Sequence, residues 1–151
     1  MVEPALASQG AGFEHGAAFI DGSFVPIGEA RTSLLDRGFL RADATYDVVG
    51  VWDGAFFRLA DHLDRFERGC AELRLELPYS RQEIESILLE VVARSGLRAA
   101  YVDLIATRGI PPEGSRDPRQ YRNRFLAYAV PYIWLFRSDD PAAGMDAVIA
   151  R

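Results

Sequence analysis

Short alternations of apolar and polar residues dominate the first part of the chain and predict β-strands. Residues 17–30, AAFIDGSFVPIGEA, contain two such segments around Asp21-Gly22, a pair typical of two-residue hairpin turns. A longer alternation from Thr45 to Trp52 predicts a strand that turns at Asp53-Gly54. The chain then returns in a shorter strand over residues 56–58.

The pattern next changes to the three- and four-residue spacing of amphipathic helices. A first helix is expected from Leu59 to Leu75 and is closed by Pro78; its apolar stripe is Leu63, Phe66, Cys70, Leu73 and Leu77. Ser80, with Glu83 three residues later, has the form of a capping box. It opens a second helix that Gly96 ends, with an apolar face made by Ile84, Ile87, Leu88, Val91 and Val92.

Two more strands and two loops complete the pattern. Residues 99–109, AAYVDLIATRG, are rich in β-branched and aromatic residues and predict a strand. Residues 124–136 predict a last strand, interrupted by Pro131. Loops are expected at residues 36–43, where charges flank a glycine, and at residues 108–123, which are rich in proline, glycine and arginine.

These segments predict one α+β domain over residues 13–136. Residues 1–12 are small and polar, as in a flexible tail, and residues 137–144 have the composition of an interdomain linker. Residues 145–151 are interpreted as the first strand of a truncated large domain. The alternative is a C-terminal strand that pairs back onto the first domain.

Composition narrows the possible classes of function. The net charge of −5 argues against a nucleic-acid binder, and no apolar run approaches the length of a membrane span. A single cysteine and the lack of a signal-peptide pattern favour a cytoplasmic protein. All 17 basic residues are arginine, so this chain cannot form a Schiff base through a lysine side chain.

Spacing alone marks few residues for chemistry. Asp103 lies in mid-strand among apolar neighbours, where a carboxylate is costly unless it is paired or faces water. It therefore faces either a cleft or the solvated side of a half-exposed sheet, and spacing leaves both open. Arg65 lies on the polar side of the first helix, four residues after Asp61, where a surface ion pair is the ordinary explanation. The two histidines and the cysteine lack the spacing of metal ligands, so no metal site is expected.

Four sequence pieces in a fixed order carry a resemblance to a known family: DRGF at Asp36, TYDVV at Thr45, WDGAFFRLADHLDRF at Trp52 and YVDLIATRG at Tyr101. Together they resemble the N-terminal half of the class IV, or fold-type IV, pyridoxal-phosphate aminotransferases. The resemblance implies the small domain of the D-amino-acid aminotransferase-like fold, with the large C-terminal domain missing.

Within that family, the chain is most similar to the (R)-selective amine transaminases. The branched-chain type usually has an arginine where Asp103 stands, and the D-amino-acid type pairs an arginine with a histidine there. This chain has neither arrangement, and its RADATYDVV, YVDLIATRG and PYIW segments resemble the amine transaminases.

The resemblance also assigns roles to individual residues. It implies that Arg65 is a ligand of the cofactor phosphate, which replaces the surface-pair interpretation; a guanidinium fork matches phosphate oxygens well. The residues that it places at the substrate are Tyr46 and Val48 in the pocket, Tyr101 and Asp103 on the neighbouring strand, Arg41 near the mouth, and Arg116 as the loop arginine that pairs with a substrate carboxylate.

The implied activity is transfer of an amino group between a primary amine or amino acid and a 2-oxo acid such as pyruvate, by a ping-pong cycle. In the family, the lysine that binds pyridoxal phosphate lies past the point that Arg151 reaches, so no catalytic residue is expected here and the isolated chain should be inactive. The complete enzyme is expected to be a homodimer without nucleic-acid or membrane partners. The alternatives are branched-chain or D-amino-acid specificity, or a non-catalytic module that binds an anion.

Overall fold

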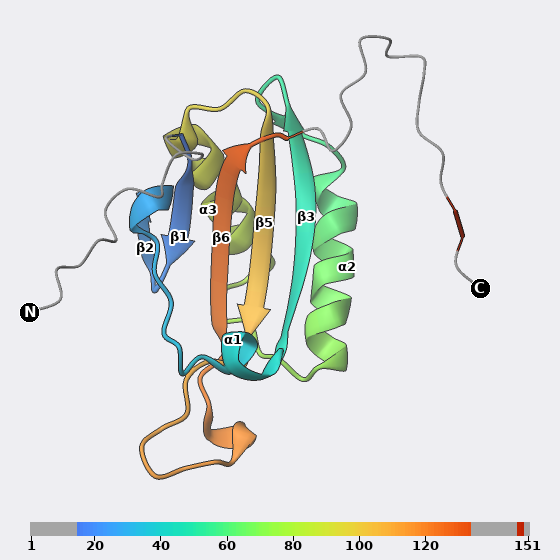
Figure 1. Ribbon diagram of the computed structural model, residues 1–151. Coiled ribbons are helices and arrows are strands. Elements are labelled where there is room, and N and C mark those ends of the chain that lie inside the picture. The colour runs from blue at the N-terminus through green and yellow to red at the C-terminus, as the bar shows by residue number, and fades with distance from the viewer. Residues whose placement is uncertain (1–14, 134–147, 150–151) are drawn as a thin grey trace, which may run out of the picture.

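A six-stranded antiparallel sheet organises the computed structural model, which describes residues 15–133 and 148–149 (Figure 1). The strand order is β2-β1-β6-β5-β3-β4, so the first strand pairs with the last one. The strands are β1 (Ala17–Ile20), β2 (Ser23–Pro26), β3 (Ala44–Trp52), β4 (Ala55–Phe56), β5 (Ala100–Thr107) and β6 (Arg124–Pro131). This arrangement confirms the expected α+β domain.

Both predicted hairpin turns are present. Asp21 and Gly22 have φ values of 50° and 76°, and Asp53 and Gly54 have 54° and 83°. Positive φ at both central residues is what a type I′ turn requires, and its twist matches that of the flanking strands. The second hairpin is shorter than predicted, because β4 ends at Phe56.

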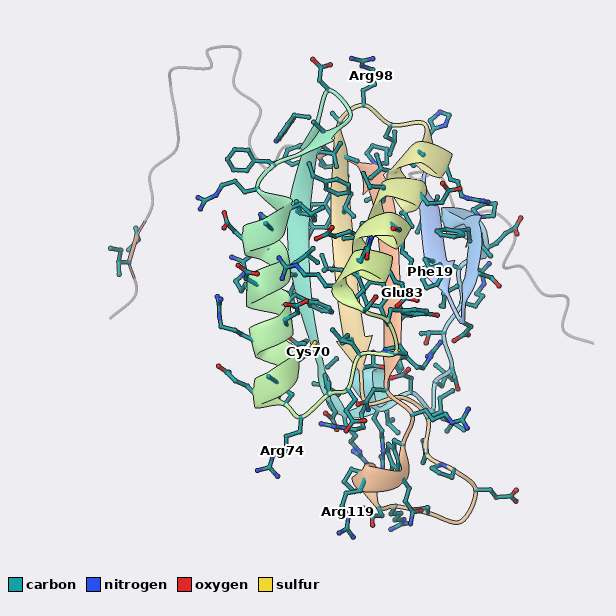
Figure 2. The ribbon with its side chains drawn as sticks, turned by 180° about the vertical axis from the view of Figure 1, so that it is seen from behind. Phe19, Cys70, Arg74, Glu83, Arg98 and Arg119 are labelled. Carbon is teal, nitrogen blue, oxygen red and sulfur yellow. The ribbon has the colours of Figure 1, made fainter. Side chains whose placement is uncertain are left out.

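Two long helices cover one face of the sheet: α2 (Leu59–Glu72) and α3 (Arg81–Ser95) (Figures 1 and 2). The predicted capping box is confirmed, since the Ser80 side chain accepts from the Glu83 amide and the Glu83 carboxylate accepts from the Ser80 amide. Gly96 ends α3 with a φ of 67°. The core between helices and sheet includes Phe19, Val49, Val51, Leu63, Phe66, Leu88, Val91, Val102, Leu104 and Phe125.

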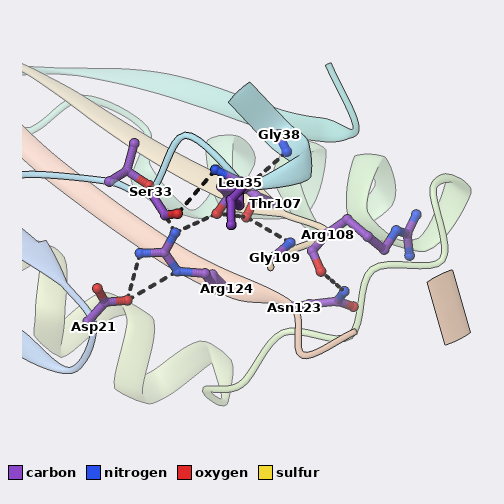
Figure 3. A network of polar contacts seen from close by, with 11 residues as sticks. Asp21, Ser33, Leu35, Gly38, Thr107, Arg108, Gly109, Asn123 and Arg124 are labelled. Carbon is purple, nitrogen blue, oxygen red and sulfur yellow. Dashed lines mark hydrogen bonds and ion pairs between the residues drawn. The ribbon is translucent and has the colours of Figure 1, made fainter. Parts of the chain in front are cut away.

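The prediction of a loop at residues 36–43 was wrong, because α1 (Arg37–Arg41) forms there. Asp36 caps this helix: its carboxylate accepts from the Gly38 amide at 2.8 Å and from the Thr107 hydroxyl at 3.0 Å. Arg124 also donates to Asp36 and to Asp21, so one network joins α1, β6 and the first hairpin (Figure 3). This long-range pairing gives a five-residue helix its stability, which local sequence does not reveal.

The loop between β5 and β6 was predicted correctly, apart from one turn of 3₁₀-helix, η2 (Pro118–Gln120). A second short 3₁₀-helix, η1 (Ile27–Glu29), follows β2. The predicted tail at residues 1–12 and linker at residues 137–144 lie outside the described residues, as does most of the predicted strand 145–151. None of the described helices is long and apolar enough to cross a membrane.

The two faces of the sheet differ in character. On the face toward α2 and α3, the β3 residues Val49 and Val51 are fully buried. The opposite face, seen from the front in Figure 1, carries Tyr46, Val48 and Trp52 of β3, as the alternation predicted. Within the described residues only the short α1 lies against this face, at the Thr107 end, so most of its aromatic side chains are partly exposed.

Candidate functional site

A buried carboxylate, Asp47, lies in the middle of β3 on the face covered by helices. Its side chain is only 1% exposed, and two side chains of α2 reach it. The Arg65 guanidinium donates through Nε at 2.5 Å and through Nη2 at 2.8 Å, and His62 Nδ1 lies 2.8 Å from Asp47 Oδ1. A mid-strand acid on a buried face is thus fully paired, as its desolvation cost demands.

These contacts keep Asp47 ionised. Burial raises the pKa of its carboxyl, but the hydrogen bonds and charges of Arg65 and His62 outweigh burial, and the net pKa lies below its ordinary value. The hydrogen bond with Asp47 in turn raises the pKa of Arg65. The ion pair is therefore present at neutral pH.

The ion pair with Asp47 leaves part of the Arg65 guanidinium available to bind another group. Asp47 occupies the Nε–Nη2 edge, and Nη2 also lies 3.3 Å from His62 Nδ1, the nitrogen that contacts Asp47. Nη1 makes no hydrogen bond within residues 15–133, and the side chain is 63% exposed. A guanidinium presents two edges with paired N–H donors, so the Nη1–Nη2 edge can bind an oxyanion while Asp47 holds the other. The surface pair between Arg65 and Asp61 suggested by helix spacing is not formed, because Asp61 pairs with Arg58.

A second buried carboxylate, Asp103 of β5, lies on the opposite face of the sheet. It is 8% exposed, and the Tyr128 hydroxyl of β6 donates to its Oδ2 at 2.9 Å. Its Oδ1 has no hydrogen-bond partner in the part of the chain that the structure describes. Burial raises the pKa of Asp103 to about 6, against the lowering effect of the Tyr128 hydrogen bond and with a further rise from the charge of Asp47.

Strand register places the predicted substrate residues around Asp103. Val48 lies directly opposite it on β3, and Tyr101 lies two positions earlier on the same face of β5. Tyr46 is two positions from Val48, and its side chain is well exposed. The structure therefore brings Tyr46, Val48, Tyr101 and Asp103 together on one face, and Asp103 is neither solvated nor surrounded by the helix-side core.

Arg41 and Arg116 make no hydrogen bond or ion pair with these residues in the described structure. Arg41 is exposed in the last turn of α1, and Arg116 is exposed in the loop between β5 and β6. That loop extends beyond the end of the sheet (Figure 1). No hydrogen bond or ion pair within the described part of the chain connects either arginine to Asp103, so their predicted substrate roles stay predictions.

Sequence reasoning missed Asp47, His62 and Tyr128. The signal for Asp47 was available, because it shares a face with Val49 and Val51, and a carboxylate there needs a partner. His62 and Arg65 are three residues apart on α2 and so point to the same neighbour. Tyr128 lies opposite Asp103 only through the pairing of β5 with β6, which local sequence does not give.

The described residues hold no group of three or more His, Cys, Asp or Glu side chains that could bind a metal ion. The side chains described above can hold an oxyanion at Arg65 and an organic group on the aromatic face.

Comparisons with known sequences and with solved structures point to the same family. The chain is 30% identical over 115 residues to the D-alanine aminotransferase of Staphylococcus haemolyticus, covering 76% of this chain and 41% of that protein. Among solved structures, the T.th. branched-chain amino acid aminotransferase complexed with N-(5'-phosphopyridoxyl)-L-glutamate matches with a TM-score of 0.70 and 27% identity, over 80% of this chain and 41% of that one.

The branched-chain aminotransferase of Thermoproteus uzoniensis with norvaline matches with a TM-score of 0.66 and 25% identity, over 77% of this chain and 40% of that one. The chain thus spans about two fifths of the length of these relatives. Their names are those of D-alanine and branched-chain aminotransferases, so they do not favour the expected closeness to amine transaminases. The sequence profile described as Amino-transferase class IV matches residues 44–146, and the chain belongs to this family.

Proposed function

We propose that this chain is the small domain of a pyridoxal-phosphate-dependent transaminase, and that Arg65 binds the phosphate of the cofactor. The observation that carries the proposal is the Arg65 guanidinium: Asp47 holds it by the Nε–Nη2 edge, and within residues 15–133 its Nη1 makes no hydrogen bond and Nη2 has one further neighbour, His62 Nδ1 at 3.3 Å. A dianionic phosphate fits the Nη1–Nη2 edge, because two parallel N–H donors match two phosphate oxygens. The bound ligand of the T.th. relative is a phosphopyridoxyl compound, which supports the same choice of group.

The position of Arg65 relative to the sheet suits a ligand that reaches both faces. Asp47 and Val48 are successive residues of β3, so the arginine and the aromatic face flank the same segment of one strand. In the described structure β4 pairs only with Val51 and Trp52. Among the described residues no strand therefore covers this edge of β3 near Asp47, and a ligand there can place its phosphate at Arg65 and its other end toward Tyr46.

When bound, pyridoxal phosphate supplies an electron sink for the carbon that loses or gains the amino group. In our proposal the residues of this chain bind and orient the cofactor and the substrate. Arg65 anchors the phosphate, and Tyr46 and Val48 contact the substrate. Tyr101 and Asp103 face the substrate from the neighbouring strand, β5. Arg41 and Arg116 are the exposed arginines that we propose to receive a substrate carboxylate near the mouth.

The substrate pair that we propose is an amino acid and a 2-oxo acid such as pyruvate. The names of the relatives support D-amino-acid or branched-chain donors. The carboxylate at Asp103 supports the alternative of simple amines, because it offers no positive charge to the carboxylate of an amino acid. A panel of D-alanine, L-leucine and a primary amine separates these possibilities.

The chain has no lysine, so the covalent attachment of the cofactor must come from outside these 151 residues. We propose that the isolated chain transfers no amino group and that activity requires a lysine-bearing large domain. We also propose a homodimer, supported by the exposed apolar side chains of Leu34, Leu35 and Phe39 around α1.

A fusion protein tests this function. Residues 1–133 are joined to the part of the T.th. enzyme that this chain does not cover, and amino transfer to pyruvate is measured with the three donors. We expect transfer from at least one donor and a loss of 100-fold or more in Arg65→Gln. Arg98→Gln, which removes an exposed arginine paired with Asp53, should leave the rate unchanged. A folded fusion that holds the cofactor and transfers nothing contradicts the proposal and favours a non-catalytic anion-binding module.

A further inference from the structure

The unpartnered oxygen of Asp103 points to a ligand. Asp103 is more than nine-tenths buried, and within the described residues its Oδ1 accepts no hydrogen bond, whereas its Oδ2 accepts one from Tyr128. Leaving a buried carboxylate oxygen without a donor is costly, so such an oxygen is usually satisfied by water or by a ligand. Asp103 Oδ1 is also the only buried side-chain atom of this kind in the described structure.

The groups around Asp103 are tyrosines and apolar side chains. Tyr128 lies opposite it on β6, Tyr101 lies two residues earlier on β5, and Tyr46 lies two positions from its β3 partner Val48. Within the described residues no arginine or histidine makes a hydrogen bond or ion pair with Asp103, and the other charge that acts on it is the negative charge of Asp47. The surroundings therefore repel a second anion.

A carboxylate beside several aromatic rings is suited to an organic cation. An ammonium donates to the carboxylate oxygen, and the negative faces of aromatic rings attract it. We propose that Asp103, with Tyr46, Tyr101 and Tyr128, binds an ammonium group of the substrate, and that this face of the sheet prefers substrates with a second ammonium over those with a second carboxylate. This inference rests on the proposed function only in taking the ligand to be a substrate. The binding of an ammonium group itself follows from Asp103 and the tyrosines around it.

The ionisation of Asp103 gives the site a pH dependence. The titratable groups that act on it are Tyr128, Tyr101 and Asp47, and Tyr46 lies on the same face. Because burial raises the pKa of Asp103 to about 6, the carboxylate is ionised at pH 7.5 and protonated at pH 5. Ammonium binding should therefore strengthen as pH rises through 6, whereas binding of an apolar chain alone should not change.

The test uses the 151-residue chain and two probes with the same five-carbon tail, n-pentylamine and hexanoate. NMR follows the Asp103 carboxyl carbon and the backbone amides of β3, β5 and β6. We expect n-pentylamine to bind at least 5-fold tighter at pH 7.5 than at pH 5, to shift the Asp103 carboxyl signal, and to bind at least 5-fold tighter than hexanoate at pH 7.5. Asp103→Asn should remove the pH dependence, whereas Asp61→Asn, at an exposed carboxylate of α2, should keep it.

Equal affinity for the two probes, or an ammonium affinity that Asp103→Asn leaves unchanged, would overturn the inference and leave water as the partner of Oδ1. If Asp103→Asn does not fold, the carboxyl signal of the wild-type chain decides, because an ammonium that leaves it unshifted does not bind there. The outcome of this ammonium-binding test does not depend on phosphate binding by Arg65. Loss of phosphate recognition with intact ammonium binding contradicts the proposed function alone, and the reverse result contradicts this inference alone.

Discussion

Asp47 and Asp103 occupy neighbouring positions on paired strands but face opposite sides of the sheet. Asp47 lies opposite Leu104, and Asp103 lies opposite Val48. Arg65 and His62 pair with Asp47 and lower its pKa, whereas Asp103 has one hydrogen-bond partner among the described residues, Tyr128, and a pKa that burial raises to about 6. Environments that push the pKa values of two nearby carboxyls apart give them different tasks. We infer that Asp47 orients a cation of the protein and that Asp103 meets a group of the ligand.

Replacing Arg65 should destabilise the fold more than its exposure suggests. Arg65→Leu leaves the buried Asp47 with His62 as its remaining partner, so we expect a loss of about 1–3 kcal/mol in the free energy of unfolding. Arg98→Leu breaks a pair exposed on both sides and should cost less than about 0.5 kcal/mol. Urea denaturation measures both values, and equal losses would show that Asp47 does not depend on Arg65.

The two carboxyls should titrate separately. In carbon-detected NMR of the folded chain, Asp103 should titrate with a midpoint near pH 6, and Asp47 with a midpoint below that of an ordinary aspartate. Tyr128→Phe removes the hydrogen bond that lowers the pKa of Asp103, so its midpoint should move upward. An Asp103 midpoint near 4 in the wild-type chain would contradict the burial of this group.

The pKa shifts of Asp47 and Asp103 determine how the free energy of unfolding changes with pH. Asp47 contributes stability above the pKa of an unfolded aspartate, about 4, and this contribution is lost as pH falls through its lower folded value. Asp103 acts in the opposite direction: between about pH 4 and 6 the folded state holds a proton that the unfolded state has lost, so its contribution falls as pH rises. Asp103→Asn should therefore flatten the stability profile between pH 4 and 6, as urea midpoints at each pH can show.

The network around Asp36 should be the most sensitive polar cluster of the fold. Asp36 is buried, caps α1, and accepts from Thr107 and from Arg124 (Figure 3). Asp36→Ala should cost about 3–5 kcal/mol, as for a buried pair that loses one partner. Asp21→Ala removes the exposed partner of Arg124 and should cost less than about 1 kcal/mol. Similar losses for the two variants would contradict this account of α1.

Cys70 should be unreactive in the folded chain. Its thiol is buried in the core on α2, and burial raises its pKa to about 11, with a smaller rise from the charge of Glu67. Because the thiolate is the nucleophile, alkylation by iodoacetamide at pH 8 should be slow until urea unfolds the chain. Rapid alkylation without denaturant would show that α2 does not pack as described.

Local pattern was sufficient to predict the hairpin turns, both long helices and the two faces of β3. These features depend on period, turn chemistry and caps, which neighbouring residues determine. The local pattern did not predict α1, because the cap at Asp36 depends on Thr107 and Arg124, which lie far along the chain. The site shows the same division: strand position marked Asp103 and family resemblance assigned Arg65, and the alternation of β3 would have marked Asp47, but the partners of the two carboxylates became visible only through tertiary pairing.

Phosphate recognition by Arg65 is the central claim, and one comparison tests it most directly. The chain is titrated with pyridoxamine 5'-phosphate and with pyridoxamine, which differ only in the phosphate, while NMR follows the Arg65 Nε–H signal. The account predicts that the phosphate compound binds at least 10-fold tighter and shifts this signal, and that Arg65→Gln removes the difference. Equal affinities for the two compounds in the wild-type chain, with an unmoved Arg65 signal, would contradict it.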